Sequence, residues 1–311
     1  MISVRTLALF VLRLAVVVGI FVLIARQVDP AAMLAAATPG LALAALVAAA
    51  FTVIQTGVNT WRWAWLGRHL PQRPPLAPSF FAYSEGLFVN QVLPSFVGGD
   101  ALRVARWREW GVLLGDAITS VLADRLYGVL GAACLASVAV ALLWTVADAR
   151  AWLAVIAATL AAGVVALVVL GAGAMRAAGG WMPRRPRMLR SVVARLARLR
   201  ITRGDAGLCL STALVGHTLA GCGALVVARA LEIDVPASII VFGTALVMLL
   251  TMVPLTLAGW GVREAGYLVL LAPFGVPPEK AILLGIVIGL QGIIAALIGG
   301  VSLLLRLAVP K

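Results

Sequence analysis

The segments LPSFVGGD at 93–100 and VPLTLAGWG at 253–261 decide how this chain folds. Each lies at the end of an apolar stretch, 77–97 and 237–258, and each places proline and glycine where a spanning helix needs an unbroken run. Proline and glycine interrupt helices. A broken helix is tolerated at membrane depth only where its free backbone groups are buried in protein or line a wet cavity. The two stretches therefore predict broken helices inside a membrane protein.

The composition agrees with a membrane location. Of the 311 residues, 63% are hydrophobic and 12% are charged, and the mean hydropathy is +1.07. A soluble domain carries about 25% charged residues, so a soluble globular enzyme is excluded. The net charge of +13 is typical of arginine-rich cytoplasmic loops, and we expect no nucleic-acid partner. The strong preference for arginine over lysine indicates a GC-rich bacterial genome, and we expect the bacterial inner (cytoplasmic) membrane.

Six further apolar runs are long enough to cross the membrane, namely 7–25, 41–60, 116–144, 151–172, 207–230 and 281–305. Arginines follow the second run, follow the first broken stretch and gather over 176–203, and such segments belong in the cytoplasm. This bias makes 77–97 a re-entrant hairpin from the cytoplasmic side and 237–262 one from outside. Both termini are then cytoplasmic.

The predicted fold is an all-α polytopic membrane protein with eight apolar segments, six full spans and two re-entrant broken-helix hairpins. The single transmembrane domain, 1–311, divides into a 3+3 inverted-topology repeat, with a first repeat at 1–145 and a second at 150–311, as in many secondary transporters. Between the spans, 176–203 forms a basic cytoplasmic linker with an amphipathic helix that lies on the membrane surface. The alternative is eight plain spans, with both hairpins crossing.

Ionisable and amide side chains fall inside the first broken stretch. Glu85, Asn90 and Gln91 are candidates for substrate binding because an ionisable residue in a membrane segment is expensive and usually functional. For Glu85 we expect Arg103 or Arg125 as the partner. A structural ion pair is the alternative reading of Glu85.

Three further candidates lie close to the first break or in the next span. Asp100 begins a predicted helix over 100–111, where it either caps the helix or contacts the substrate. Arg103 follows one turn later and could bind a phosphate with two hydrogen bonds, or it could be an interfacial arginine. Asp124 and Arg125 lie within the third span, where Arg125 provides a cation for an anionic headgroup or a structural tie between the repeats.

The second break carries a corresponding pair, Arg263 and Glu264. Arg263 follows Pro254 by nine residues, as Arg103 follows Pro94. We expect the two arginines to lie at opposite mouths of a groove and to hand an anionic headgroup across by way of Arg125. The sequence contains no metal-ligand spacing and no nucleotide-binding loop, so we predict no metal site, no cofactor and no catalytic residues.

Three segments carry a resemblance to a known family: NQVLPSFVGGDALRVARW (90–107), SVLADRLYGVLG (120–131) and PLTLAGWGVREAGYLVLLAPFGV (254–276). In order and spacing the chain resembles the lysylphosphatidylglycerol synthase transmembrane region family, a group of flippase-like membrane proteins. The resemblance implies movement of lipids or lipid-linked intermediates. The family's best-known members join this region to a soluble aminoacyl-transferase domain. Since nothing soluble follows Lys311, we do not expect lipid aminoacylation here.

The sequence therefore predicts a lipid transporter or flippase, not an enzyme, that moves an anionic phospholipid or a polyprenyl-phosphate-linked lipid between leaflets. Anionic membrane lipids are the expected partners, and a lipid-modifying enzyme or glycosyltransferase could join them. Two alternatives stay open. One is an intramembrane transferase that uses a lipid-linked donor, and the other is a membrane scaffold for a glycosyltransferase or lipid synthase.

Overall fold

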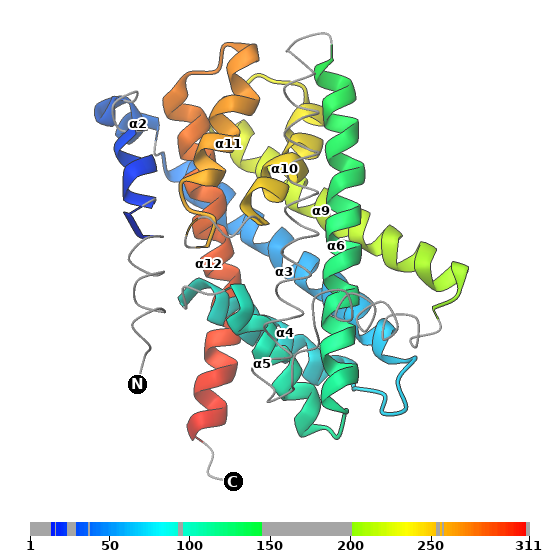
Figure 1. The fold of residues 1–311 in the computed structure, drawn as a ribbon. Helices are drawn as coiled ribbons and strands as arrows, with labels where there is room; N and C mark the ends of the chain where they lie inside the picture. The colour runs from blue at the N-terminus through cyan, green and yellow to red at the C-terminus, as the bar shows by residue number, and fades with distance from the viewer. Residues whose placement is uncertain are drawn as a thin grey trace. The chain divides into compact units, whose positions relative to one another are not determined.

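A computed structural model describes residues 14–15, 17–23, 29–36, 38–92, 96–144, 201–252, 256 and 258–308. All regular secondary structure in these ranges is helical (Figure 1). The helices in chain order are α2 (Pro30–Ala36), α3 (Pro39–Gly67), α4 (Leu76–Val92), α5 (Phe96–Glu109), α6 (Leu114–Leu143), α9 (Arg203–Ala230), α10 (Ala237–Met252), α11 (Val262–Leu271), the short 3-10 helix Ala272–Phe274 and α12 (Pro278–Ala308).

Four of these helices, α3, α6, α9 and α12, are long and apolar enough to cross a membrane. They have 28 to 31 residues, or about 42–46 Å at the usual rise, which exceeds the roughly 30 Å of a bilayer core. They confirm four of the predicted spans as long apolar helices. The predicted span at 7–25 is described only in part. The span at 151–172 and most of the linker at 176–203 lie outside the described residues.

The helices begin where the sequence supplies starting signals. Pro30, Pro39 and Pro278 each occupy a first helical position, where the missing N–H has no partner to lose. At the start of α9, the Thr202 hydroxyl accepts a hydrogen bond from the Asp205 N–H at 3.1 Å, and the Asp205 carboxylate accepts one from the Thr202 N–H at 3.1 Å. This reciprocal arrangement is a capping box.

Both stretches with proline and glycine form two helices each, α4 with α5 and α10 with α11, and the helices within each pair pack against one another. In the first pair the two backbones approach closely at Gly86 and Gly99. The space is so small that a Cβ on Gly99 would collide with the Gly86 carbonyl oxygen. The breaks are therefore present. Re-entry of each pair from one side of a membrane, and the 3+3 repeat, stay predictions.

The chain forms two compact units. Unit 1 comprises 1–53, 133–159 and 217–295, and unit 2 comprises 54–132, 160–216 and 296–311. Helices α10 and α11 belong to unit 1, and α4 and α5 belong to unit 2. Each unit draws on both halves of the sequence. The repeat boundaries at 145 and 150 stay a prediction.

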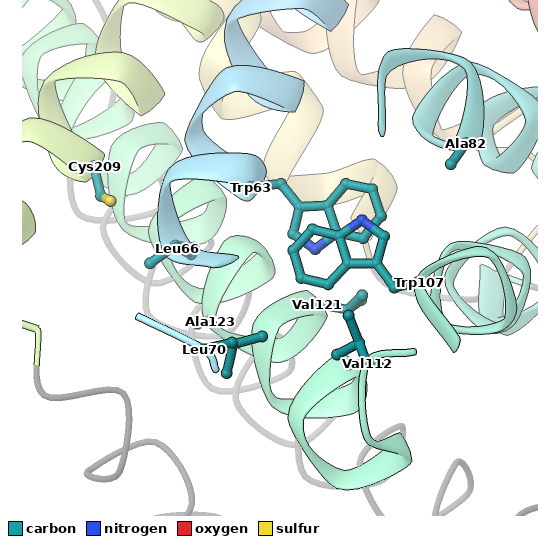
Figure 2. Packing of buried hydrophobic residues seen from close by; sticks show 10 residues of the cluster. Trp63, Leu66, Leu70, Ala82, Trp107, Val112, Val121, Ala123 and Cys209 are labelled. Atoms are coloured by element: carbon teal, nitrogen blue, oxygen red, sulfur yellow. The ribbon is translucent and has the colours of Figure 1, made fainter. Parts of the chain in front are cut away.

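The core of unit 2 is built around two tryptophans. Trp63 on α3 and Trp107 on α5 are fully buried, and their rings stack with centroids 4.1 Å apart and planes 5° apart. Figure 2 shows the two indoles face to face among small and aliphatic side chains. Each indole N–H donates to a serine hydroxyl, Trp63 to Ser120 at 3.1 Å and Trp107 to Ser79 at 3.2 Å. The pair therefore fixes α5 against α3, and the serines leave no indole donor unpaired.

The C-terminal part of α12 also packs in unit 2. A Cβ on Gly299 would overlap the Ser84 carbonyl group, and a Cβ on Gly300 would crowd the Phe88 ring. These two glycines let α12 approach the backbone of α4 closely. In unit 1, the core includes Tyr267, whose hydroxyl lies 3.0 Å from the Thr244 hydroxyl in a fully buried contact between α11 and α10.

Candidate functional site

One face of α5 carries the charged groups that organise unit 2. Asp100, Arg103 and Trp107 are spaced by three and four residues, so their side chains lie on the same side of the helix. Since Trp107 anchors this face against α3, Asp100 and Arg103 are directed toward the neighbouring helices. The packing of one aromatic residue thus positions two charges.

Asp124 on α6 binds two arginines from two other helices. Its Oδ1 accepts a hydrogen bond from Nε of Arg62 at 2.8 Å, and its Oδ2 accepts one from Nη2 of Arg103 at 2.7 Å. The Asp124 side chain is 2% exposed, and each arginine side chain is 4% exposed. Buried charges are stable only when they are paired and hydrogen-bonded. These three residues therefore hold α3, α5 and α6 together.

The guanidinium of Arg103 also lies between two aromatic rings. Its Cζ is 4.2 Å from the ring centroid of Trp63 and 4.2 Å from that of Tyr83. A planar guanidinium over an aromatic face gains cation–π energy. Arg103 is therefore fixed by a carboxylate on one side and by two rings on its faces.

Asp100 forms a two-pronged ion pair with Arg125 on α6. Nε of Arg125 donates to Oδ2 at 3.0 Å, and Nη2 donates to Oδ1 at 3.0 Å. Nη1 of Arg103 lies 3.5 Å from the same Oδ1. The Arg125 side chain is 35% exposed and that of Asp100 15%, so this pair is much less covered than the Asp124 pairs.

Glu85 on α4 is the third carboxylate of unit 2 and is fully buried. Its Oε2 accepts a hydrogen bond from Nε of Arg106 at 2.6 Å, and its Oε1 accepts one from the Ser302 hydroxyl at 2.6 Å. Nε of Arg306 lies 2.9 Å from the same Oε1. Glu85 thus joins α4 to α5 and to the end of α12.

Arginines outnumber carboxylates in this cluster. Five arginines meet three covered carboxylates and one exposed carboxylate, namely Arg62, Arg103, Arg106, Arg125 and Arg306 against Glu85, Asp100, Asp124 and Glu109. Two guanidinium nitrogens, Nη1 of Arg62 and Nε of Arg103, are buried without a hydrogen-bond partner among the described residues. Excess positive charge with spare N–H donors suits an anionic oxygen ligand.

The second broken pair presents a smaller and balanced arrangement in unit 1. Arg263 on α11 donates from Nε to the Gly285 carbonyl at 2.8 Å and from Nη2 to the Glu264 carboxylate at 2.8 Å. Its guanidinium lies over the Trp260 ring, 4.6 Å from the centroid. The Glu264 carboxylate also accepts the Gly261 N–H. The positive charge of Arg263 is therefore balanced by the negative charge of Glu264.

A comparison with known proteins identifies the family. The profile described as "Lysylphosphatidylglycerol synthase TM region" matches residues 10–300. The chain belongs to this family. Searches of curated proteins and of solved structures found no match. The match covers both broken helix pairs and all nine candidate residues, and of the site just described only Ser302 and Arg306 lie beyond the matched range.

Membership of this family corrects one expectation. The sequence predicts that the chain is not an enzyme, but the family is named for lysylphosphatidylglycerol synthase and is therefore associated with an enzyme. That expectation rests on the lack of catalytic and metal-ligand motifs in the sequence. Such motifs say nothing about a synthase to which a transmembrane region belongs, so the prediction was wrong in its reasoning as well as in its outcome.

The structure brings most of the predicted residues of unit 2 into the ion pairs around α5, which form two groups, one around Asp100 and Asp124 and one around Glu85. Glu85, Asp100, Arg103, Asp124 and Arg125 all take part, with Asp124 and Arg125 pairing to different residues. The other candidates lie at the edge of these groups or outside them. They are Asn90, whose Oδ1 accepts the Gly99 N–H at 2.9 Å, Gln91, which is exposed at the end of α4, and Arg263 with Glu264 in unit 1.

Two details of the predicted site are wrong. The expected partners of Glu85 were Arg103 or Arg125, but its partners are Arg106 and Arg306, because Arg106 occupies the face of α5 turned toward α4. Asp100 is not an N-cap, because α5 begins at Phe96 and Asp100 lies inside the helix. Its carboxylate is free of the backbone and pairs with Arg125 instead.

Sequence reasoning missed three arginines of the cluster. Arg62 was assigned to a cytoplasmic loop, but α3 continues to Gly67 and buries it. The signal was present in the segment WRW at 61–63, where an arginine between tryptophans extends an apolar helix. Arg106 and Arg306 were counted only as markers of the cytoplasmic side. Their partner Glu85 is distant in sequence, so no local pattern reveals the contact.

Proposed function

We propose that this protein moves an anionic lipid, either a phospholipid or a polyprenyl-phosphate-linked lipid, between the leaflets of the bacterial inner membrane. The headgroup would bind at the arginine cluster of unit 2, and Arg263 of unit 1 would bind it in a separate step. The observation that carries this proposal is the excess of arginine over carboxylate around α5, with spare buried donors on Arg62 and Arg103.

The physical basis is the cost of moving a charged headgroup through hydrocarbon. An unpaired ion in a low-dielectric medium is strongly disfavoured, and fixed guanidinium groups replace the water that the headgroup leaves behind. Arginine suits this role because its fork of N–H donors matches two oxygens of one phosphate. The membership of a lipid-synthase transmembrane family supports a lipid as the ligand.

A translocation assay in proteoliposomes tests the proposal. Vesicles would carry fluorescent lipids with anionic, zwitterionic or polyprenyl-phosphate headgroups, and a membrane-impermeant quencher would report the pool protected in the inner leaflet. We expect the protein to deplete the protected pool of an anionic lipid faster than that of a zwitterionic one. Arg125→Gln should slow this depletion by about tenfold, the effect of losing about 1.4 kcal/mol of charge-assisted bonding.

The matched control is Arg108→Gln, which removes the same charge from an exposed position on α5. If both variants slow transport equally, general surface charge and not the cluster is responsible. Unchanged protection of every lipid, with protein shown to be folded by its melting curve, would refute the proposal.

The family's description supports a second candidate. Because the family is named for a synthase, the chain could act as a membrane scaffold that presents lipid to a synthase or glycosyltransferase. The same vesicles distinguish the two: mass spectrometry of the lipids after addition of a bacterial membrane extract would reveal a modified headgroup that forms only with the protein present. A scaffold would raise that yield without depleting the protected pool in purified vesicles.

A further inference from the structure

We propose that Asp100 competes with the anionic ligand for Arg125. Its carboxylate occupies the two N–H donors of Arg125 to which the ligand would bind. This inference rests on the proposed function and adds a residue that sets affinity and release. A carboxylate and a phosphate each present two oxygens to a guanidinium in the same way. The Asp100 carboxylate already uses that geometry, with two contacts of 3.0 Å to Arg125.

Within the cluster of unit 2, Arg125 is the most accessible of the arginines that pair with an aspartate. Its side chain is 35% exposed, compared with 4% for Arg62 and 4% for Arg103. A ligand entering the cluster would therefore meet Arg125 before it met the covered arginines. To bind with two hydrogen bonds, it would have to displace Asp100.

Once the ligand displaces it from Arg125, the Asp100 carboxylate can bind a second arginine, Arg103. Nη1 of Arg103 already lies 3.5 Å from Oδ1 of Asp100, while Nη2 of Arg103 holds Asp124. A small side-chain movement would complete the bond to Nη1, since a guanidinium has five donors. The exchange therefore never leaves a carboxylate without a cation, which would be the expensive outcome at a covered site.

The other two carboxylates lack this freedom. Both oxygens of Asp124 are bound by buried arginines, and its side chain is 2% exposed. Both oxygens of Glu85 are also occupied, and Glu85 is fully buried. Of these three carboxylates, Asp100 is the one whose own side chain is partly accessible, at 15% exposed compared with 2% for Asp124 and 0% for Glu85.

The test compares equilibrium binding of dihexanoyl-phosphatidylglycerol to the purified full chain in a neutral detergent. Isothermal titration calorimetry would give Kd for the wild type, for Asp100→Asn and for Asp100→Ser as a second variant. Dihexanoyl-phosphatidylcholine serves as the zwitterionic comparison. We expect removal of the competing charge to lower Kd for the anionic lipid by about tenfold, equivalent to about 1.4 kcal/mol, and to leave the zwitterionic lipid unaffected.

Asp234→Asn is the matched control, because it makes the same substitution at a fully exposed aspartate that pairs with Arg229 and does not belong to the cluster. It should leave Kd within about twofold of the wild type, since exposed charges are screened by salt. Adding Arg125→Gln to Asp100→Asn should cancel the gain. If either Asp100 variant binds the anionic lipid no more tightly than the wild type, or if Asp234→Asn gives the same gain, the inference is overturned.

The binding measurement separates this inference from the proposed function. Tighter binding by Asp100→Asn without transport by any variant would support the competitor and refute the flippase. Transport by the wild type with no gain in binding for Asp100→Asn or Asp100→Ser would support the flippase and refute the competitor. No binding by any variant would overturn the competitor, because an Arg125 freed of its carboxylate must then bind.

Discussion

Glu85 and Arg306 form an ion pair of 2.9 Å between residues that lie far apart in the sequence. The Glu85 carboxylate is fully buried, and Arg106 and Ser302 donate to it as well. The Glu85 side chain thus links α12 to both α4 and α5. The stability of unit 2 should depend strongly on that carboxylate.

We expect Glu85→Gln to lower the thermal stability of the protein markedly. Loss of one partner of a buried ion pair costs about 3 kcal/mol because the remaining charge is left uncompensated. Here Arg306 and Arg106 both lose the Glu85 carboxylate, although Arg106 keeps its pair with Glu109. The melting midpoint in detergent, followed by size-exclusion chromatography after heating, measures this. Glu109→Gln removes an exposed carboxylate and should shift the midpoint little. Equal shifts for both variants would contradict a structural role for Glu85.

The close packing of α12 on α4 gives a second prediction. Gly299→Ala places a methyl group where the Ser84 carbonyl lies, and such overpacking destabilises a core by about 1–3 kcal/mol. Gly57→Ala on α3 is the control, because a Cβ there meets nothing within 4 Å and alanine is the better helix former. The same melting assay should show a loss for Gly299→Ala and no loss for Gly57→Ala. A stable Gly299→Ala protein would show that α12 lies further from α4.

Arg103 should be sensitive to replacement by lysine even though the charge is kept. Lysine has neither the planar group that lies against Trp63 and Tyr83 nor the separate nitrogens that reach Asp124 and Asp100. We expect Arg103→Lys to slow lipid translocation by about tenfold or more, as for the loss of one charge-assisted hydrogen bond. Arg108→Lys, at an exposed position on the same helix, should transport normally. Wild-type rates for Arg103→Lys would mean that charge alone suffices.

Much of the fold could be predicted from the sequence because membrane helices carry a strong local signal. The apolar runs at 41–60 and 116–144 and the breaks near Pro94 and Pro254 need only neighbouring residues to be recognised. A bilayer requires long apolar helices and forbids free backbone groups. These two constraints act on each segment separately, so single segments reveal them.

The pairing of charges could not be predicted in the same way. Glu85 is a clear candidate as an acid in an apolar segment, but its partner Arg306 is decided by how α12 packs on α4, through Gly299 and Gly300. The paired glycines before Asp100 predict a helix that starts at Asp100, but α5 begins four residues earlier, at Phe96. In the structure Gly99 permits close packing of α5 against α4 instead.

A direct role of Arg263 in transport can be distinguished from its structural role by also changing its partner, Glu264. Arg263→Met leaves the buried Glu264 carboxylate without its arginine, and we expect a loss of about 3 kcal/mol in stability. In Arg263→Met with Glu264→Gln no charge is left unpaired, so the melting midpoint should recover in part. If Arg263 serves the headgroup, translocation stays lost in the double variant although the protein is folded. If translocation returns together with stability, Arg263 is a structural partner of Glu264, and the path of the headgroup involves the cluster of unit 2 alone.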